Sequence, residues 1–390
     1  MKRMIALLAA LILLMGSGTA PGEEIVIPEI ETAQFSIPEN EALALIREMK
    51  AGWNLGNTFD AHGCNWVKDK MDYESAWCGE KTSRELIRAL KEAGFNTVRI
   101  PVSWHDHLSG EWEIDTDWLD RVYEVASWVC EEGMFAIVNI HHDDDPAFYY
   151  PDEAHYENSA RYVRTLWAQI AEKFADFDRH LIFESINEPR LKGTDHEWWW
   201  DPDSRECREA MEQIVRLNQV FVDTVRAGGG NNAERYLMVP AYDANPEYAC
   251  AEAFRLPEDP AENRIIVSAH AYSPYDFALQ QPGVSTFSLQ NEGQKAGISG
   301  FLQKLYETWV SRGIPVLMGE FGAMEKDGNL QDRVDWISFY VANARARGIT
   351  CCWWDNNLFR GRGERFGLFD RATARCVHPE ILAAFMKYCE

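Results

Sequence analysis

Short runs of apolar residues recur along the chain, and longer segments of mixed polarity separate them. Within each run the apolar residues are continuous rather than alternating with polar ones, which is typical of strands that are buried on both faces. The pattern predicts eight strands, at residues 51–55, 95–102, 134–142, 180–187, 235–242, 264–272, 315–321 and 348–354.

The intervening segments have the spacing of helices with one buried face. In residues 160–177 the apolar side chains recur at steps of three and four positions. Residues 204–227 repeat this spacing, and the glycines at 228–230 are expected to end that helix. Comparable helices are predicted at 83–93, 118–132, 299–311 and 331–347.

Eight buried strands that alternate with helices predict an α/β fold in which a parallel sheet closes into a (β/α)8 barrel, or TIM barrel. The alternative is an open, doubly wound sheet, which usually carries a glycine-rich turn for a nucleotide phosphate. No strand-to-helix turn of this sequence has the GxGxxG or the P-loop pattern. We therefore expect one catalytic barrel domain at residues 41–390, after a lead-in rich in proline and glutamate at 21–40.

The first 20 residues have the layout of a secretory signal peptide. Lys2 and Arg3 precede an apolar run from Met4 to Met15, and small residues follow it. This run is short for a membrane span, and no other stretch is apolar enough to be one. We therefore expect a secreted protein with no membrane segment after cleavage; the alternative is an uncleaved anchor helix.

Composition narrows the class of partner. With 46% hydrophobic and 12% aromatic residues, the 390-residue chain can form a large core. The net charge of -24 argues against nucleic acid and against an anionic membrane surface, because both need clustered lysine and arginine. A neutral polysaccharide is compatible with this negative charge. It also fits the abundance of aromatic residues, because sugar rings stack on the faces of tryptophan and tyrosine. We expect a monomer.

Nine cysteines are present, so at least one of them is unpaired if the protein is exported. No CxxC spacing indicates a zinc site. Cys64 and Cys78 fall in one predicted loop, and we expect them to be able to form a disulfide there.

A (β/α)8 barrel places its catalytic groups at the carboxyl ends of the strands. Polar and aromatic residues gather at these positions in nearly every predicted strand, which core packing does not require. They are Asn57, Arg99, Trp104, His141, His142, Asn187, Glu188, Tyr242, His270, Tyr272, Glu320, Trp353, Trp354 and Asp355.

Two of these residues are glutamates on strands four and seven, which lie across the barrel from each other. Glu188 alone could simply begin a helix, because Pro189 follows it. A second carboxylate, Glu320, changes this interpretation, because cleavage of a glycosidic bond needs two facing carboxyl groups. A serine hydrolase is disfavoured, since the sequence has no GxSxG pattern.

Eight sequence blocks support this chemistry by resemblance to a known family. FESINEPR and PVLMGEFG resemble the acid/base and nucleophile signatures of glycoside hydrolase family 5 in clan A. The other blocks are similar to the cellulase and xyloglucanase branch of that family, its fourth subfamily, and occur in family order over nearly the whole mature chain. They are GWNLGNTFDAHG, FNTVRIPVSWHDHL, IVNIHHDDD, VSAHAYSPYDFAL, CCWWDNN and ERFGLFDR.

The resemblance implies an endo-β-1,4-glucanase that retains anomeric configuration, and together with the signal-peptide pattern it leads us to expect a secreted enzyme that uses no cofactor and no metal. Glu188 would be the general acid/base and Glu320 the nucleophile. The substrate could instead be xyloglucan, mixed-linkage glucan, mannan or xylan. A carbohydrate-binding barrel without catalysis is a further alternative, which the two glutamates disfavour.

The same resemblance implies roles for the surrounding residues. Arg99 would hold Glu320 in its charged form, and Asn187 would contact the sugar 2-hydroxyl. Trp354 would form a stacking floor, with a cis peptide bond to Asp355. The remaining substrate-binding candidates, which would line the site around the glutamates, are Asn57, His141, His142, His270 and Tyr272.

Two further segments have less definite interpretations. His141 to Asp145, HHDDD, could ligate a metal, but neighbouring residues on a strand point to opposite faces, so few of them can converge on one ion. Trp198 to Trp200 could line the leaving-group side of a cleft or cover a hydrophobic edge. Candidates for the non-reducing side are Trp66, Tyr73, Trp77 and Asn356.

Overall fold

The computed structural model describes residues 24–389, and the predicted signal peptide at 1–20 lies outside them. Eight parallel strands close into a barrel in the order β1-β10-β9-β8-β7-β6-β5-β2, as predicted. The strands are β1 (Ala51–Leu55), β2 (Thr97–Ile100), β5 (Phe135–Asn139), β6 (Leu181–Glu184), β7 (Leu237–Pro240), β8 (Ile265–His270), β9 (Val316–Phe321) and β10 (Thr350–Asp355).

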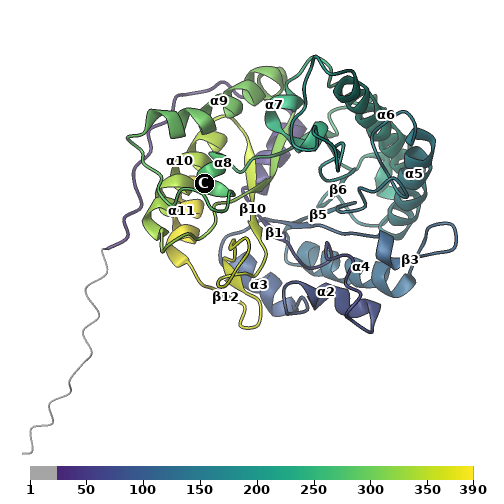
Figure 1. Cartoon of the computed structure of the whole chain (residues 1–390), viewed down its shortest axis with the longest axis horizontal. Coiled ribbons are helices and arrows are strands. Elements are labelled where there is room, and N and C mark those ends of the chain that lie inside the picture. The colour runs from purple at the N-terminus through teal and green to yellow at the C-terminus, as the bar shows by residue number, and fades with distance from the viewer. Residues whose placement is uncertain (1–23, 390) are drawn as a thin grey trace, which may run out of the picture.

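Long helices surround the barrel (Figure 1), and each predicted helix is present. They are α3 (Arg84–Glu92), α4 (Thr116–Glu131), α5 (Tyr156–Lys173), α6 (Arg205–Ala227), α9 (Glu292–Thr308) and α10 (Leu330–Ala346). Gly228 caps α6, as expected. Helix α9 begins seven positions before the predicted start at 299, because Asn291 caps it by accepting hydrogen bonds from the N–H groups of Gly293 and Gln294.

Several smaller elements complete the fold without having been predicted. Two antiparallel hairpins extend from the barrel, β3 (Leu108–Ser109) with β4 (Glu113–Ile114) and β11 (Phe369–Asp370) with β12 (Arg375–Cys376). The remaining α-helices are α1 (Glu41–Met49), α2 (Tyr73–Ala76), α7 (Pro246–Ala249), α8 (Tyr275–Ala278) and α11 (Pro379–Cys389).

Helix α1 closes the amino-terminal end of the barrel. Its apolar face packs against side chains that fill the barrel interior, in one buried cluster made of Ala42, Leu45, Ile46, Met49, Phe135, Ile137, Ile182, Tyr236, Met238, Ile266, Leu317 and Cys352. Gly52 permits this packing, because a Cβ there would lie 2.1 Å from the Cys352 sulfur. The interior is therefore solid at this end, which leaves the carboxyl ends of the strands for a site.

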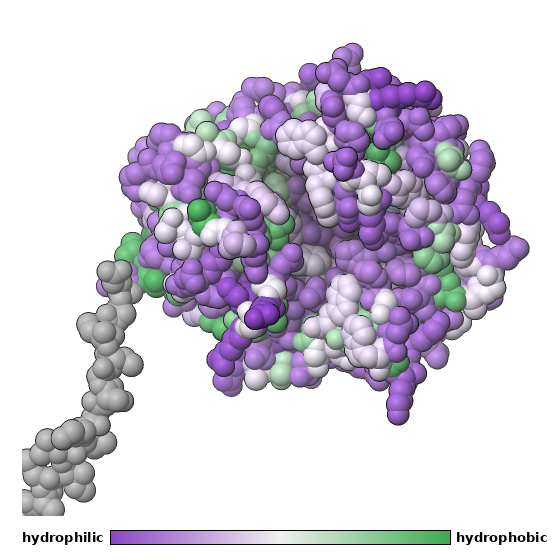
Figure 2. All heavy atoms as spheres, in the orientation of Figure 1, coloured by the Kyte–Doolittle hydropathy of each residue, from purple (hydrophilic) through white to green (hydrophobic). Residues whose placement is uncertain are grey.

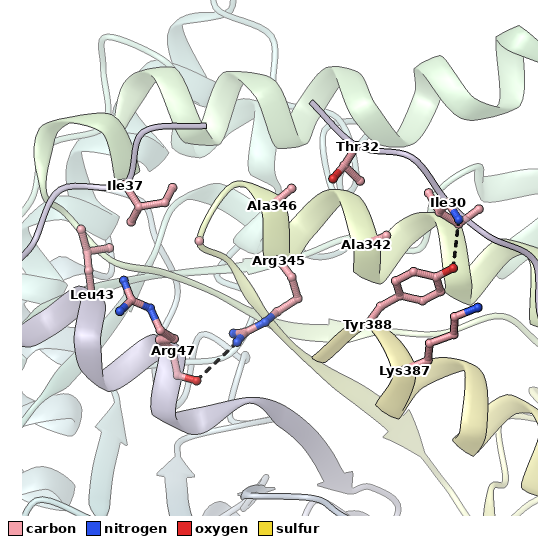
Figure 3. Close-up of a pocket in the computed structure, with 11 residues that line it drawn as sticks. Ile30, Thr32, Ile37, Leu43, Arg47, Ala342, Arg345, Ala346, Lys387 and Tyr388 are labelled. Carbon is pink, nitrogen blue, oxygen red and sulfur yellow. Dashed lines mark hydrogen bonds between the residues drawn. The ribbon is translucent and has the colours of Figure 1, made fainter. Parts of the chain in front are cut away.

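The lead-in at residues 24–40 has no helix or strand and lies along α10 and α11. The Val26 N–H donates to Gln331 Oε1 at 2.8 Å, and the Ile30 N–H donates to the Tyr388 hydroxyl at 3.0 Å. Figure 3 shows a cavity of about 430 Å3 between this segment and α1, α10 and α11. No strand-end candidate lines this cavity, so it is separate from the predicted site.

Two local features bear on the expectations of disulfides and membrane segments. All nine cysteines are free, so the Cys64–Cys78 disulfide prediction is wrong. Each thiol contacts a different backbone carbonyl group instead. The Cys64 sulfur lies 3.4 Å from His62 O, and the Cys78 sulfur lies 3.1 Å from Glu80 O. Among residues 24–389, no helix combines the length and the apolar character that a bilayer crossing requires.

Candidate active site

Loops at the carboxyl ends of the strands surround a hollow, which the space-filling view shows near the middle of the molecule among mostly hydrophilic residues (Figure 2). Most strand-end candidates are gathered at these ends. Strand β6 leaves the ladder after Glu184, and the following residues stay close to the barrel through their own backbone bonds. The Ser185 N–H donates to Met238 O and the Asn187 N–H to Ile140 O. This path ends the strand earlier than the predicted residue 187 and presents Asn187 and Glu188 at the rim.

Arg99 on β2 is fully buried and forms the centre of the site. Its guanidinium donates to Glu184 Oε2, Glu320 Oε1 and Asn187 Oδ1, each at 2.7 Å. Burial lowers the pKa of Arg99, but the charges of Glu184 and Glu320 outweigh burial and raise it. The predicted contact between Arg99 and Glu320 is confirmed.

Glu320 on β9 has a donor on each carboxylate oxygen. Arg99 binds Oε1, and the Tyr272 hydroxyl donates to Oε2 at 2.9 Å. Hydrogen bonds of this kind stabilise a negative charge, and a cation makes them stronger. Burial and the charge of Glu320 raise the pKa of Tyr272 well above its ordinary value, so this phenol remains a donor.

Glu188 lies beside Glu320, with His270 in contact with both. His270 Nδ1 is 2.7 Å from Glu188 Oε1 and 3.7 Å from Glu320 Oε1. One oxygen of each carboxylate and one ring nitrogen of His270 lie within 4.8 Å of one another. The two predicted glutamates therefore share one small space at the mouth of the barrel.

The charges of this cluster shift its proton equilibria. Burial raises the pKa of Glu188, but the hydrogen bond and charge of His270, with the charge of Arg190, outweigh it and bring the pKa below its ordinary value. Burial lowers the pKa of His270, whereas the charge of Glu320 and the bond to Glu188 raise it above 6.5. The protonation of Glu188 is thus decided by its neighbours rather than by burial alone.

Trp354 on β10 presents its ring to the site, next to Gly56. A Cβ at Gly56 would lie 2.7 Å from the Trp354 ring, so the close packing of these two segments needs glycine there. The His141 ring is parallel to that of Trp354, with 5.9 Å between their centres. Trp353, on the opposite face of β10, is buried in the outer core with Phe321 and Trp336 instead.

The predicted cis peptide between Trp354 and Asp355 is wrong. The cis bonds of the described residues are Ser273–Pro274 and Gln281–Pro282. The Trp354–Asp355 bond continues the parallel pairing of β10 with β1, in which Asn54 lies opposite Trp354 and Leu55 opposite Asp355, and extended backbone at that point accommodates a trans bond.

β5 ends at Asn139, so His141 and His142 follow the strand instead of lying on it as predicted, and their ring centres are 4.4 Å apart. Ligand-type atoms of these two histidines and Asp60 come within 4.8 Å of one another. However, His141 Nδ1 faces the Asn139 side-chain amide at 3.1 Å, and Asn139 also donates to Glu184. Because an amide nitrogen can only donate, His141 Nδ1 accepts from Asn139, so this nitrogen already has a partner.

Comparison with known proteins identifies the family of this chain. The family model "Cellulase (glycosyl hydrolase family 5)" matches residues 59–359, which is most of the chain. The chain belongs to glycosyl hydrolase family 5. It is therefore a glycoside hydrolase, and the resemblance that its sequence blocks indicate is confirmed.

Three known proteins show what this family 5 chain is similar to. Endoglucanase B of Ruminococcus albus is 39% identical over 375 residues, which cover 95% of this chain and 86% of that protein. A family 5 lichenase variant from Caldicellulosiruptor sp. F32, in complex with cellotetraose, is 52% identical with a TM-score of 0.93, covering 94% of this chain and 100% of that one. A GH5-4 broad specificity endoglucanase from Ruminococcus champanellensis with bound cellotriose is 41% identical with a TM-score of 0.83, covering 90% and 100%.

Around the central cluster of this family 5 site, the peripheral candidates fall into two groups. Trp66, Trp198 and Trp199 are exposed by 67%, 58% and 70%, and the Arg190 guanidinium lies 4.2 Å above the Trp198 ring. Trp77 lies next to His142, with 6.1 Å between ring centres. The second group has structural partners: Tyr73 packs on His107, Trp200 donates to Cys207 O, and Asn356 donates to Glu364 O.

Asn57 has a left-handed backbone with φ of 55°, and its N–H donates to Asp60 Oδ2 at 2.9 Å. This turn holds the loop after β1 at the rim.

Sequence reasoning missed Glu184, Asn139 and Asn54, whose Oδ1 accepts from Arg99 at 3.0 Å. Glu184 is buried inside β6 and accepts from Arg99, Asn139 and Ser268, so it supports the site from below. A charged residue within an apolar strand is a signal that could have identified it, because buried charges need partners.

Proposed function

We propose that the protein is a secreted endo-β-1,4-glucanase that cleaves internal bonds of a β-glucan with retention of configuration. The observation that carries this proposal is the proximity of Glu188 and Glu320, whose oxygens approach within 4.8 Å. Retaining glycosidases have carboxyl groups about 5–5.5 Å apart, whereas inverting enzymes need about 6.5–9.5 Å to admit a water molecule.

In this mechanism Glu320 attacks the anomeric carbon, and the bond to the leaving oxygen breaks as Glu188 donates its proton to that oxygen. The product is a glycosyl ester of Glu320. Glu188, now a carboxylate, removes a proton from water, and the water oxygen displaces Glu320. Arg99 and the Tyr272 hydroxyl support this sequence, because both donate to Glu320 whenever it is a carboxylate.

The surrounding residues bind the sugar next to the cleaved bond. Asn187 is held by Arg99 with its amide nitrogen free to donate, which suits the 2-hydroxyl of that sugar. Trp354 offers an apolar ring face beneath the sugar. The other groups that line this position are Asn57, His141, His142 and His270.

The relatives' names favour a glucan with β-1,4 bonds. One relative is an endoglucanase, and solved neighbours hold cellotetraose or cellotriose. A second candidate substrate is mixed-linkage β-glucan, which is favoured by the 52% identity to a lichenase. Xyloglucan is a further candidate, because a xyloglucan-specific endo-β-1,4-glucanase is 33% identical with a TM-score of 0.80. No cofactor or metal is part of the proposed reaction.

Two glutamine variants test the assignment on carboxymethylcellulose. Glu188→Gln and Glu320→Gln should each abolish hydrolysis while the circular dichroism spectrum shows that the fold is intact, because glutamine matches glutamate in shape. A near-normal rate in either variant would reject the proposed role of that residue. A product profile on cellulose-like glucan, mixed-linkage glucan, xyloglucan, mannan and xylan then decides the backbone.

Export and a monomeric state are part of the same proposal. The amino-terminal pattern of Lys2, Arg3 and an apolar run supports export. Sequencing of the amino terminus of protein recovered from the culture medium tests it, with a start near residue 21 expected.

A further inference from the structure

The segment that follows β10 carries positive charge next to the candidate active site. This segment, the arginine loop, spans residues 356–367. One of its arginines, Arg365, is paired with Glu325 at 2.8 Å. Arg360 and Arg362 are exposed, and no carboxylate in the described part of the chain lies within 4.0 Å of either guanidinium. Because the whole chain has a net charge of -24, two cations without an acidic partner stand out.

Contacts from two sides hold the arginine loop in place. The Asn356 side chain, directly after β10, donates to Glu364 O at 2.6 Å. From the loop after β8, Gln281 Nε2 donates to Gly363 O at 2.6 Å. Gly361 and Gly363 have φ of 88° and 114°, which glycine adopts without strain, so the chain can turn sharply at this tip. The two unpaired arginines therefore project from a loop whose backbone is fixed.

The arginine loop lies against residues of the candidate active site. Phe366 is buried in one cluster with Trp354, and its ring centre is 5.4 Å from that of Tyr272. Tyr272 in turn donates to Glu320. Figure 1 shows this part of the chain, in yellow, between β10 and β12. The loop is therefore part of the wall of the cleft at the strand ends.

A polysaccharide in the cleft lies within electrostatic range of the loop. Partial burial and the negative charges of Glu320 and Glu188 raise the pKa of Glu364, so this loop residue is near both glutamates. Arg362 is two positions from Glu364, which is at most about 7 Å along the backbone. Salt screens charges over about 8 Å under physiological conditions. Arg362 and Arg360 can therefore act on a bound polymer, whereas distant acidic groups of the surface are screened from it.

The chemistry of the two arginines indicates which substituent they would bind. A guanidinium donates two parallel hydrogen bonds to a carboxylate, and its positive charge strengthens them. The hydroxyl groups of a neutral glucan need no such charge. A uronic acid or a carboxymethyl group on the polymer offers the carboxylate that the loop lacks.

We propose that Arg360 and Arg362 make the enzyme selective for β-1,4-linked polysaccharides with carboxylate substituents, by binding such a substituent at the rim of the cleft. Neutral polymers of the same backbone are cleaved as well, without this added affinity. The inference rests on the proposed function, because it names a substrate class for the same cleft.

The double variant Arg360→Gln/Arg362→Gln tests the inference, since glutamine remains polar and loses the charge. Its kcat/KM on carboxymethylcellulose should fall by about 3–20-fold at low salt, because an exposed ion pair contributes about 1.5–5-fold to affinity. On hydroxyethylcellulose, which has the same backbone and no charge, kcat/KM should equal that of the wild type. Arg360→Lys/Arg362→Lys keeps the charges and should keep most of the preference.

A second double variant, Arg164→Gln/Arg312→Gln, is the matched control. Both of these arginines are exposed and lie away from the strand ends, on α5 and in the turn before β9. The control removes the same two positive charges and should leave the ratio of the two kcat/KM values unchanged. An equal change of this ratio in the control, or an equal loss on both polymers in the loop variant, would overturn the inference.

Salt dependence provides an independent measurement on the same proteins. An increase from about 0.01 M to about 1 M salt shortens the screening length from about 30 Å to about 3 Å. The difference between the wild type and the loop variant on carboxymethylcellulose should therefore disappear at high salt. A difference that persists unchanged would show that the arginines do not act through their charge.

Binding without turnover keeps this test distinct from that of the proposed function. Native electrophoresis through gels with carboxymethylcellulose should retard the wild type more than the loop variant, with the matched control retarded like the wild type. If the wild type hydrolysed no β-glucan, the proposed function would fail, but this retardation would still support carboxylate binding by the loop. Equal retardation of the loop variant and the matched control would contradict it.

Discussion

Arg99 and Glu184 form an ion pair at the centre of the barrel, with 2.7 Å between nitrogen and oxygen and neither side chain exposed. The same guanidinium reaches up to Glu320 and Asn187, so one buried side chain connects the base of the site to its reactive surface. Glu184 also accepts from Asn139 and Ser268, which fixes its orientation. The position of Glu320 therefore depends on groups below it that do not touch the substrate.

Arg99→Lys should reduce both stability and turnover. A lysine keeps the charge, but its single ammonium group cannot donate to Glu184, Glu320 and Asn187 in the fixed directions of a guanidinium. Hydrogen bonds to charged groups contribute about 1.5–3 kcal/mol each, so losing one or two of them should lower the free energy of unfolding by about 2–5 kcal/mol, measured by denaturant titration. Arg179→Lys, at the exposed pair with Glu48, is the control and should cost at most about 1 kcal/mol. Equal effects of the two substitutions would contradict the central role of Arg99.

Trp354 and Trp353 are adjacent residues whose alanine variants should fail in different ways. Trp354→Ala removes the ring face in the cleft and should lower kcat/KM of the folded protein by about 10–100-fold, and it should also lower the melting temperature because Trp354 is buried against Met324 and Phe366. Trp353→Ala leaves a cavity among buried aromatic rings and should destabilise the fold by about 3–5 kcal/mol. Activity assays and thermal melts of both proteins distinguish the two faces of β10. A stable, fully active Trp354→Ala protein would exclude the stacking role.

The strands that place these residues were predictable, and so were the two glutamates. Each strand is a continuous apolar run, and Glu188 and Glu320 directly follow or end such runs. The contacts of Arg99 could not be derived, because Glu184, Asn187 and Glu320 lie 85 to 221 positions away from it along the chain.

The wrong predictions have physical reasons as well. Cys64 and Cys78 share a loop, but their spacing does not fix the directions of their side chains. The start of α9 was missed because Gly293 and Gly297 interrupt its apolar pattern, whereas the cap at Asn291 defines it in the structure.

His107 should make the protein sensitive to acid. Its ring stacks on Trp118 at 3.6 Å in the core, and burial, with the charge of Lys70, lowers its pKa from 6.5 to about 3. The unfolded chain binds a proton near pH 6.5 and the folded protein does not. The contribution of neutral His107 to stability is therefore complete above pH 6.5 and is lost as the pH falls from there toward 3, by up to about 1.4 kcal/mol per pH unit.

Two substitutions at His107 test this pH dependence. His107→Phe and His107→Gln remove the titrating group in different ways, and the difference in free energy of unfolding between each variant and the wild type should move in favour of the variant between pH 6.5 and 4. Denaturant titrations at several pH values provide this measurement. A difference that is constant over the range would show that His107 does not titrate as described.

Chelation should leave the reaction unaffected. Protein groups hold both carboxyls, His270 at Glu188 and Arg99 with the Tyr272 hydroxyl at Glu320, so the proposed mechanism needs no cation. The value of kcat after dialysis against EDTA should equal that of the untreated enzyme. Activity that falls on chelation and returns with an added divalent cation would reject the two-glutamate account.

The most direct test is to trap the covalent intermediate on Glu320. A 2-deoxy-2-fluoro-β-cellobiosyl fluoride slows both steps, and the good leaving group allows the first step to proceed. Intact mass spectrometry should show one added fluorocellobiosyl group, and digestion should locate it on the peptide that contains Glu320. An adduct on Glu188, or turnover of this reagent that produces the α-anomer, would contradict the assignment of Glu320 as the nucleophile of a retaining glucanase.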